Sequence, residues 1–375
     1  MEKRKKLKKF GFDLEAYEKA QDYEFDSLII NIGSTIASLL VLVLFLLFGS
    51  KPLYGFLSGS LGNVWAVRAI YIVIFAVGFF LLDLPTSWLS FRLEHKYELS
   101  NQNTKSWLID QLKSLLISLA LALVGFTVLF WTIAVSDLWW VWTWIAFTVI
   151  SIFIGFISPT LLMPLFYNFQ TLEDEDLKKG LKELANRANL DVLGVFNMEA
   201  SEKTKKAIGA LTGIGSSRRI ILSDTMLENY SAEEIEAVIA HEMGHHKYYD
   251  IWFLLGLQSL FSLLGFYLIA RFIDPVLGYF SLGLNVSALP VILGMMEIIL
   301  FTLSPLKNWL SRIRERAADG FSLNLVDNPN ALGEALVKLS QQNLGNPAPP
   351  RLVEWLFYDH PSGLNRVERA MDYEG

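Results

Sequence analysis

The sequence contains no cysteine among its 375 residues. It can therefore form no disulfide and offers no thiol nucleophile, and its redox compartment is left open. Charge is also scarce, because Asp, Glu, Lys and Arg make up 19% of the chain against 53% hydrophobic residues. Such a composition is too apolar for an ordinary soluble domain of this size. We therefore expect an integral membrane protein.

A cleavable signal sequence is not expected, because the first apolar run begins about twenty residues after a basic cluster and follows a charged stretch. The whole chain has a net charge of −6, so this cluster is not a basic domain for nucleic acid. Basic residues beside membrane spans stay on the cytoplasmic side. The cluster therefore predicts a cytoplasmic amino terminus and no nucleic-acid partner. Its members are Lys3, Arg4, Lys5, Lys6, Lys8 and Lys9.

Long apolar runs alternate with polar segments along the chain. Each has about 20 residues, enough for a helix to cross a hydrocarbon core of roughly 30 Å. Residues 52–64 and 86–114 between them are expected to be loops, and the Lys and Arg of the second place it inside. Six crossings then put both termini and the insert 167–250 in the cytoplasm. The runs are residues 28–48, 65–84, 115–135, 139–163, 251–272 and 286–306.

The polar segments divide the chain into four parts: a membrane region 1–166, a catalytic insert 167–250, two further spans 251–306 and a cytoplasmic part 307–375. Within the insert, residues 192–196 and 219–222 have the content of strands, and residues 207–213 are expected to form a hairpin with the second. Ser231 and Glu234 form a capping box that begins a helix. We therefore predict a predominantly α membrane protein whose cytoplasmic catalytic domain carries a small β-sheet.

That helix carries His241-Glu242-Met243-Gly244-His245, an H-E-x-x-H motif. Residues four apart lie on one face of a helix, so the two imidazoles can share one Zn²⁺. Glu242 points toward the open side of that ion and is the expected general base. Three of the five histidines of the chain lie in this stretch, which argues against chance. The plain alternative is a solvated helix end that carries His and Glu.

A catalytic zinc site takes three protein ligands, so a third ligand must come from elsewhere. We predict that Glu315 is this ligand, because it lies in a charged stretch on the same side of the membrane as the motif. The other candidate, Glu297, lies within an apolar run and is expected to face an internal polar cavity or another helix. Asp319, one turn after Glu315, is expected to accept the Nδ1–H of a zinc-bound histidine or to pair with nearby arginines. His246 is expected to support the site from outside the ligand set or to lie at the surface.

Motifs in order over nearly the whole chain resemble the type I CAAX prenyl proteases, integral-membrane zinc metalloproteases of the gluzincin type. They cover residues 15–20, 94–102, 218–225, the zinc helix, 311–319, His360-Pro361 and Arg366. The resemblance implies one Zn²⁺ on His241, His245 and Glu315, with Glu242 as catalyst. It also implies that His360 and Arg366 reach the active site, to bind substrate backbone or the oxyanion.

The family fold that the resemblance implies is a ring of spans around a water-filled chamber, which Glu297 and Arg68 can face. One departure is the lack of an extra amino-terminal span found in eukaryotic members, which favours a prokaryotic member. Another is Ile208, where the family usually has an Asn that is thought to hold substrate backbone. The edge strand that carries Ala207, Ile208, Gly209 and Ala210 can still add a peptide by main-chain hydrogen bonds.

Together these features predict a zinc metalloendopeptidase in the lipid bilayer, with a cytoplasmic active site and the plasma membrane as its location. Its expected substrate is a peptide or protein, prenylated or not, cut near the carboxyl terminus. One alternative is a membrane quality-control protease of the heat-shock metallopeptidase type, although those chains are shorter and lack the 94–102 signature. A second alternative is a non-catalytic zinc-containing scaffold, which has no need of Glu242.

Overall fold

The computed structural model describes residues 2–373, and in this part of the chain six helical stretches are long and apolar enough to cross a membrane. Each of the six predicted runs lies within one of them, so the predicted number of spans is confirmed. The stretches are Leu14–Ser60, Val64–Lys96, Thr104–Val135, Trp139–Leu165, Asp250–Phe280 and Val286–Leu325.

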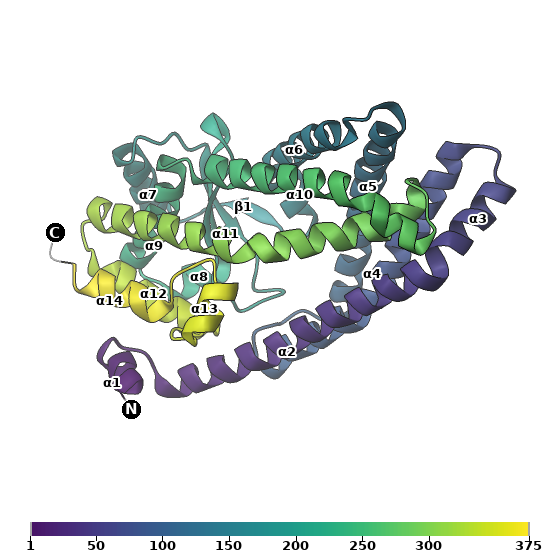
Figure 1. Cartoon of the computed structure of the whole chain (residues 1–375). Helices are drawn as coiled ribbons and strands as arrows, with labels where there is room; N and C mark the ends of the chain where they lie inside the picture. Colours follow the sequence, from purple (N-terminus) through teal and green to yellow (C-terminus); the bar gives the residue numbers. More distant parts are fainter. Residues whose placement is uncertain (1, 374–375) are drawn as a thin grey trace.

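Helices make up most of the described chain, and one small sheet accompanies them (Figure 1). The α-helices are α1 (Glu2–Lys9), α2 (Leu14–Leu44), α3 (Ser50–Ser60), α4 (Val64–Lys96), α5 (Thr104–Val135), α6 (Trp139–Ile157), α7 (Glu175–Arg187), α8 (Asp224–Asn229), α9 (Ala232–Lys247), α10 (Asp250–Phe280), α11 (Leu289–Leu325), α12 (Asn330–Gln342), α13 (Arg351–Phe357) and α14 (Gly363–Met371). The strands are β1 (Phe169–Thr171), β2 (Gly194–Met198), β3 (Gly209–Thr212) and β4 (Arg219–Ser223).

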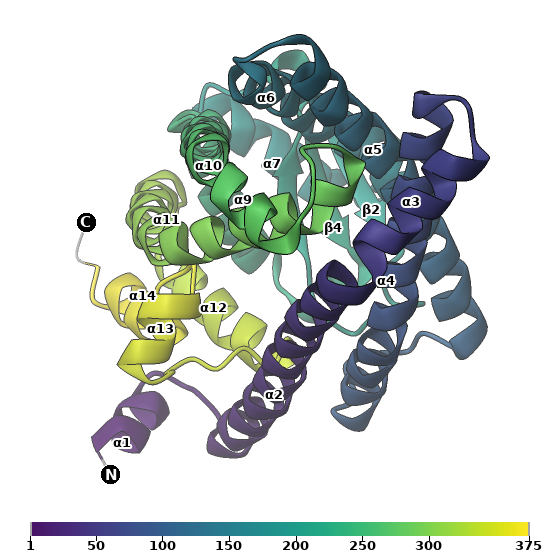
Figure 2. The ribbon, with the colours of Figure 1, turned by 45° about the vertical axis from the view of Figure 1, so that its right-hand side comes forward.

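The long helices α2, α4, α5, α6, α10 and α11 form a ring (Figure 2). Each packs against the next, and α11 also contacts α2, so the ring closes. Large apolar side chains lie exposed along these helices, for example Leu40, Val149 and Phe301. Such a surface is unfavourable in water but suits the hydrocarbon of a membrane. Helices can lie there because they satisfy their own backbone hydrogen bonds. The shorter helices and the sheet gather at the end of the ring opposite α3 (Figure 1).

Two segments that the sequence predicts as loops are largely helical. Residues 52–64 fall mostly in α3, because the helical backbone of α2 continues through a π-turn at Phe45–Gly49. Residues 86–114 are shared between the end of α4 and the start of α5. Pro85 lies inside α4 without ending it, since a proline within a helix removes one N–H donor and is tolerated when neighbouring helices pack around it. Both loop predictions are therefore wrong.

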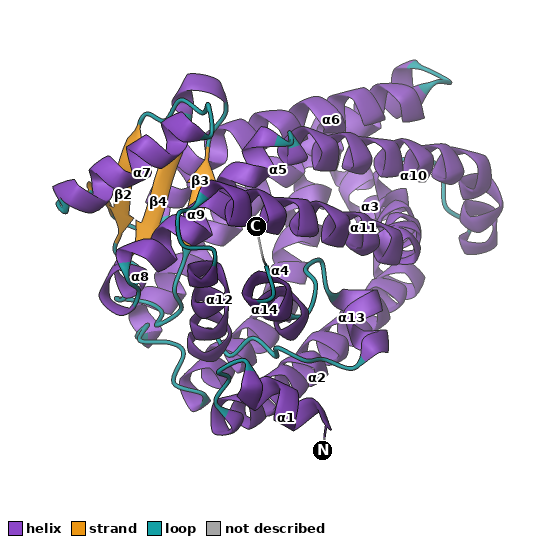
Figure 3. Cartoon of the chain, turned by 90° about the vertical axis from the view of Figure 1, so that its left-hand side faces the viewer, coloured by secondary structure: helices purple, strands orange, loops and turns teal. Residues whose placement is uncertain are grey.

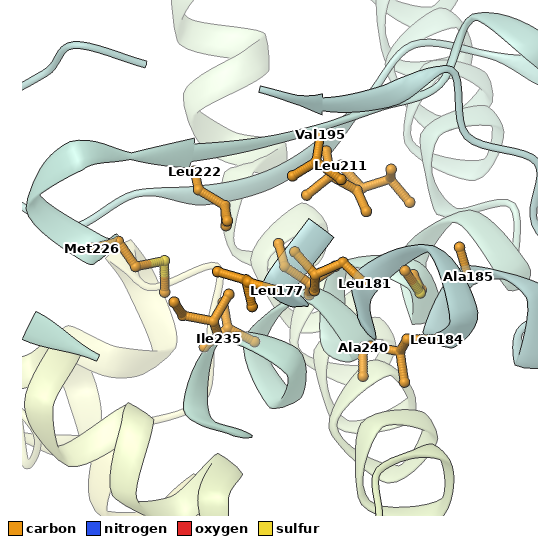
Figure 4. Packing of buried hydrophobic residues seen from close by; sticks show 14 of the residues in the cluster. Leu177, Leu181, Leu184, Ala185, Val195, Leu211, Leu222, Met226, Ile235 and Ala240 are labelled. Carbon is orange, nitrogen blue, oxygen red and sulfur yellow. The ribbon is translucent and has the colours of Figure 1, made fainter. Parts of the chain in front are cut away.

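The sheet has the order β1-β2-β4-β3 and mixes parallel and antiparallel pairs. Strands β2 and β4 are parallel, whereas β3 pairs antiparallel with β4, as the predicted hairpin requires. Strand β2 begins two residues later than predicted, because its pairing with β4 starts at Gly194 opposite Arg219. Buried side chains of α7, α9, β2 and β4, such as Leu181, Val195, Leu222 and Ile235, form the core between this sheet and the helices (Figure 4).

Helix α9 begins with the predicted capping box, in which the Ser231 side chain accepts the Glu234 N–H and the Glu234 carboxylate accepts the Ser231 N–H. Helix α11 crosses α9 closely at Gly244. A Cβ added to Gly244 would lie 2.9 Å from Cα of Ala318, so only glycine permits this approach. The crossing places Glu315 of the long helix α11 beside the histidines of α9.

Candidate metal centre

His241 and His245 of α9 and Glu315 of α11 lie together, with one potential ligand atom of each within 4.8 Å of the others. The Nε2 atom of His241 is 3.4 Å from Glu315 Oε2, and Nε2 of His245 is 3.3 Å from Glu315 Oε1. The two Nε2 atoms are 3.2 Å apart. The structure therefore brings together the three residues that the sequence predicts as ligands.

This cluster fits a divalent cation. Oε2 of Glu315 is buried without a hydrogen-bond partner among the described residues, and a buried carboxylate oxygen left unpaired is costly. Two imidazole nitrogens and one carboxylate oxygen are ligands that transition metals such as zinc accept. Three protein ligands also leave a coordination position for water, which is the pattern of catalytic sites.

The imidazole of His241 is supported on its other side by Asp319 and Arg366. Nδ1 of His241 is 2.9 Å from Asp319 Oδ1. Arg366 of α14 donates from Nε to Asp319 Oδ2 at 3.0 Å and from Nη2 to Asp319 Oδ1 at 2.6 Å. This contact fixes the tautomer with Nε2 free for a metal. Asp319 thus contacts both a histidine of the cluster and an arginine, and the three side chains are nearly buried.

His245 has a parallel support that sequence reasoning missed. Its Nδ1 is 2.8 Å from Oδ2 of Asp250, a buried residue in the first turn of α10. Arg314 of α11 pairs with Asp250 and also donates to the carbonyl of Tyr248. The sequence offered one signal of this contact, because Asp250 is an acidic residue five positions after His245. The chain reverses at Tyr249, in the left-handed region at φ 57°, which brings Asp250 back to the ring of His245.

Burial lowers the pKa of His245, but the hydrogen bonds to Asp250 and Glu315 outweigh it and raise this pKa to about 10. Burial and Arg366 likewise lower the pKa of His241, yet Asp319 and Glu315 raise it above its ordinary value. His245 therefore carries a proton on both ring nitrogens at neutral pH in the metal-free chain. A metal must displace the proton on Nε2 to bind.

Glu242 is partly exposed on α9. Burial lowers the pKa of Arg366, but Asp319 and, to smaller extents, Glu315 and Glu242 raise it, and Glu242 is also a minor contributor to the raised pKa of His245. His360 approaches from the segment before α14, with Nε2 3.3 Å from Glu315 Oε1 and about half of its side chain exposed, at 51%. Nη1 of Arg366 is 3.9 Å from Glu315 Oε2. The structure thus places all three predicted catalytic residues around the cluster, with Arg366 already bound to Asp319.

The remaining residues that the sequence predicts for the site lie on α9, at or just before β3, and on α11. His246 is buried and reaches the carbonyl of Leu211 on β3, and burial lowers its pKa. Ala207 hydrogen-bonds the side chain of Asn343, and Ile208 packs beside the buried Met198 and Ile221. Gly209 and Ala210 begin β3. Glu297 is exposed on α11, 18 residues before Glu315, which is about 27 Å along a helix.

Comparisons with known proteins agree with this geometry. Residues 3–168 match the model "CAAX prenyl protease N-terminal, five membrane helices", and residues 171–374 match "Peptidase family M48". An uncharacterized metalloprotease, YhfN of Bacillus subtilis, is 32% identical over 77% of this chain and 70% of its own length. CAAX prenyl protease 1 of Saccharomyces cerevisiae is 30% identical, over 78% of this chain and 69% of its own.

The crystal structure of S. mikatae Ste24p has a similar fold, with a TM-score of 0.85 over 96% of this chain and 90% of that protein. Its sequence identity to this chain is 24%, so this likeness speaks for the fold alone. The predicted fold class, a helical membrane protein with a small sheet, is confirmed.

Proposed function

This chain is a membrane metallopeptidase of family M48, the family of the CAAX prenyl proteases, and from that premise we propose that it uses Zn²⁺ held by His241, His245 and Glu315. The observation that carries this proposal is the cluster of His241, His245 and Glu315, in which the buried Oε2 of Glu315 has no hydrogen-bond partner among the described residues. When bound, such an ion supplies Lewis acidity and lowers the pKa of a neighbouring water.

The residues around the cluster take distinct roles in this proposal. Glu242 accepts a proton from the attacking water and returns it to the leaving amine. His360, half exposed and close to Glu315, donates a hydrogen bond to the oxyanion. Arg366, whose side chain is 12% exposed, pairs with Asp319; we propose that it holds the support of His241 in place and adds positive charge beside the oxyanion.

We propose that the substrate is a peptide or protein with a prenylated carboxyl terminus that lies extended along β3. The names of the curated relatives and the position of β3 at the edge of the sheet support this substrate class. We also propose that the chain lies in the plasma membrane with its metal site in the cytoplasm. The basic α1 at the same end of the helical ring as the metal site supports that orientation.

The test is an assay of the protein purified in detergent against matched farnesylated and unmodified peptides that end in a CAAX sequence. Chelator-sensitive cleavage that prefers the farnesylated peptide supports the proposal. Equal cleavage of both peptides would contradict the prenyl preference and favour the quality-control role. Glu242→Gln, loaded with zinc, is the inactive control.

A further inference from the structure

Strand β3 is the edge of the sheet beside α9 (Figure 3). The carbonyl of Ile208, directly before it, accepts the Ser223 N–H at 2.8 Å. Backbone groups alternate in direction along a strand. Residues 208, 210 and 212 therefore turn their N–H and C=O groups toward β4, whereas Ala207, Gly209 and Leu211 turn theirs to the open edge.

The open edge is already occupied before Gly209. Asn343, at the end of α12, accepts the N–H of Ala207 at its Oδ1 at 2.9 Å and donates from Nδ2 to the carbonyl of Ala207 at 3.1 Å. The neighbouring Gln342 donates from Nε2 to the carbonyl of Lys205 at 2.7 Å. These side chains take the place of a partner strand, which is how proteins cover a sheet edge.

The open edge is also occupied after Gly209. Nε2 of His246 is 2.8 Å from the carbonyl of Leu211. Nε of Arg218, which can only donate, is 3.2 Å from Nδ1 of His246. The arginine therefore assigns the proton of the imidazole to Nε2, which donates to Leu211. His246 follows His245 on α9, so this end of the edge lies next to the metal cluster.

Only a short window remains between these two ends. The N–H and C=O of Gly209 and the N–H of Leu211 have no hydrogen-bond partner within residues 2–373. Gly209 itself suits close packing, because an added Cβ would lie 3.0 Å from the sulfur of Met226 and 3.2 Å from Cγ1 of Val238. The window therefore offers a peptide two donors and one acceptor on a strand held firmly against α8 and α9.

We infer that Asn343 and His246 limit substrate pairing to these three main-chain hydrogen bonds and so set the register of the peptide at the metal cluster. The inference rests on the proposed peptidase function. His246 and Asn343 are then specificity-determining residues that act through β3. A single substrate N–H, the one that donates to Gly209, has an acceptor on this edge. A substrate N–H that faces Leu211 must compete with His246 for that carbonyl, which already accepts from the imidazole at 2.8 Å.

The test is a scan in which each backbone amide of a cleaved fluorogenic peptide is N-methylated in turn. His246→Ala frees the carbonyl of Leu211, so a second amide, two residues from the first, becomes sensitive to methylation. KM for the unmethylated peptide falls roughly two- to tenfold, the value of one net hydrogen bond, with kcat little changed. His246→Gln, which can still donate to Leu211, keeps the wild-type pattern.

Asn343→Ala is the second variant, and it acts at the other end of the window. It exposes the backbone of Ala207, so a new sensitive amide appears on the opposite side of the Gly209 partner. If both alanine variants still cleave the peptide and neither changes its methylation pattern, the inference is wrong. If neither alanine variant cleaves the peptide, His246→Gln and Asn343→Gln replace them. The inference is also wrong if these two glutamine variants cleave the peptide with altered patterns. Absence of cleavage by the zinc-loaded wild-type chain would instead contradict the proposed function.

Discussion

The two imidazoles of the metal cluster have the same kind of support but differ in burial and in the part of the chain that supplies it. His241, Asp319 and Arg366 have side chains 8%, 4% and 12% exposed. His245, Asp250 and Arg314 have side chains 20%, 3% and 27% exposed. The first set depends on α14, near the carboxyl end, whereas the second is made at the start of α10.

This difference has an energetic consequence. Water can solvate Arg314 if its carboxylate is lost, and the rings of Tyr248 and Phe253 also lie near its guanidinium. Arg366 lies too deep for water to replace Asp319. The support of His241 is therefore tied to the stability of the fold, and the support of His245 mainly to metal binding.

The largest expected effect comes from a residue that belongs to neither support. Glu242→Gln keeps both histidines, both aspartates and the metal, but removes the general base. We expect kcat to fall about 10²- to 10⁴-fold, with zinc content unchanged by elemental analysis. Turnover like that of the wild type would exclude Glu242 as the base.

Replacing each aspartate in turn measures the difference between the supports. Asp319→Ala takes both carboxylate hydrogen bonds from the nearly buried Arg366 and leaves it only Oε2 of Glu315, at 3.9 Å, as a carboxylate partner, so we expect a loss of about 3–5 kcal/mol in the free energy of unfolding. Asp250→Ala leaves a partly solvated arginine, so we expect a loss of roughly 1–2 kcal/mol, in the middle of the range for single changes. Both variants should bind zinc about 10- to 100-fold more weakly.

Denaturant unfolding of the metal-free proteins gives the two free energies. The double variant Asp319→Ala/Arg366→Leu is the control, because it removes the unpaired charge and should be more stable than Asp319→Ala alone. Equal losses for the two aspartates, with no recovery in the double variant, would remove the distinction between the supports.

The pH dependence of zinc binding tests the charges of the histidines. Since the pKa of His245 is raised to about 10 in the metal-free chain, the imidazole keeps its proton through neutral pH and loses it only as pH rises toward that value. Zinc affinity should therefore increase with pH, and binding at pH 7 should release protons. Calorimetry in buffers of different ionisation enthalpy counts them.

The same raised pKa has a consequence for the metal-free fold. The protonated His245 contributes stability that is full below its ordinary value of 6.5 and is lost as pH rises through about 10. Asp250→Asn should reduce both this contribution and the number of protons released. Proton release that is absent, or unaffected by this change, would contradict the assignment.

The smallest expected effect concerns Arg314 alone. Arg314→Gln keeps Asp250 in place at a position where the arginine side chain is 27% exposed, so we expect zinc affinity to fall less than in Asp250→Ala. Arg366→Gln, the matched change in the other support, should cost more stability, because the guanidinium that it removes is 12% exposed against 27% for Arg314 and water replaces it less readily. The reverse order, measured by zinc titration and thermal unfolding, would contradict the comparison.

Local patterns allowed much of this molecule to be predicted. The capping box, the spacing of His241 and His245 and the six apolar runs each depend on residues near one another in the chain. Glu315 was predictable because it lies in a charged stretch after the last span. The continuation of α4 past Pro85 was not predictable, because the packing of neighbouring helices decides whether a proline ends a helix.

Contacts between distant segments were out of reach of the sequence. The pairing of Asp250 with His245 depends on the left-handed turn at Tyr249, and the cover of β3 by Asn343 depends on where α12 ends. Arg366 was predicted through the family resemblance alone, since its spacing carries no signal of Asp319. These contacts arise because α11 crosses α9 at Gly244 and α14 packs against α11.

The central claim is that one ion is shared by His241, His245 and Glu315. It is tested most directly by the zinc content of purified Glu315→Ala beside Glu297→Ala. We expect Glu315→Ala to lose its zinc while remaining folded, and Glu297→Ala to keep about one zinc per chain. Full zinc occupancy in Glu315→Ala would contradict the claim.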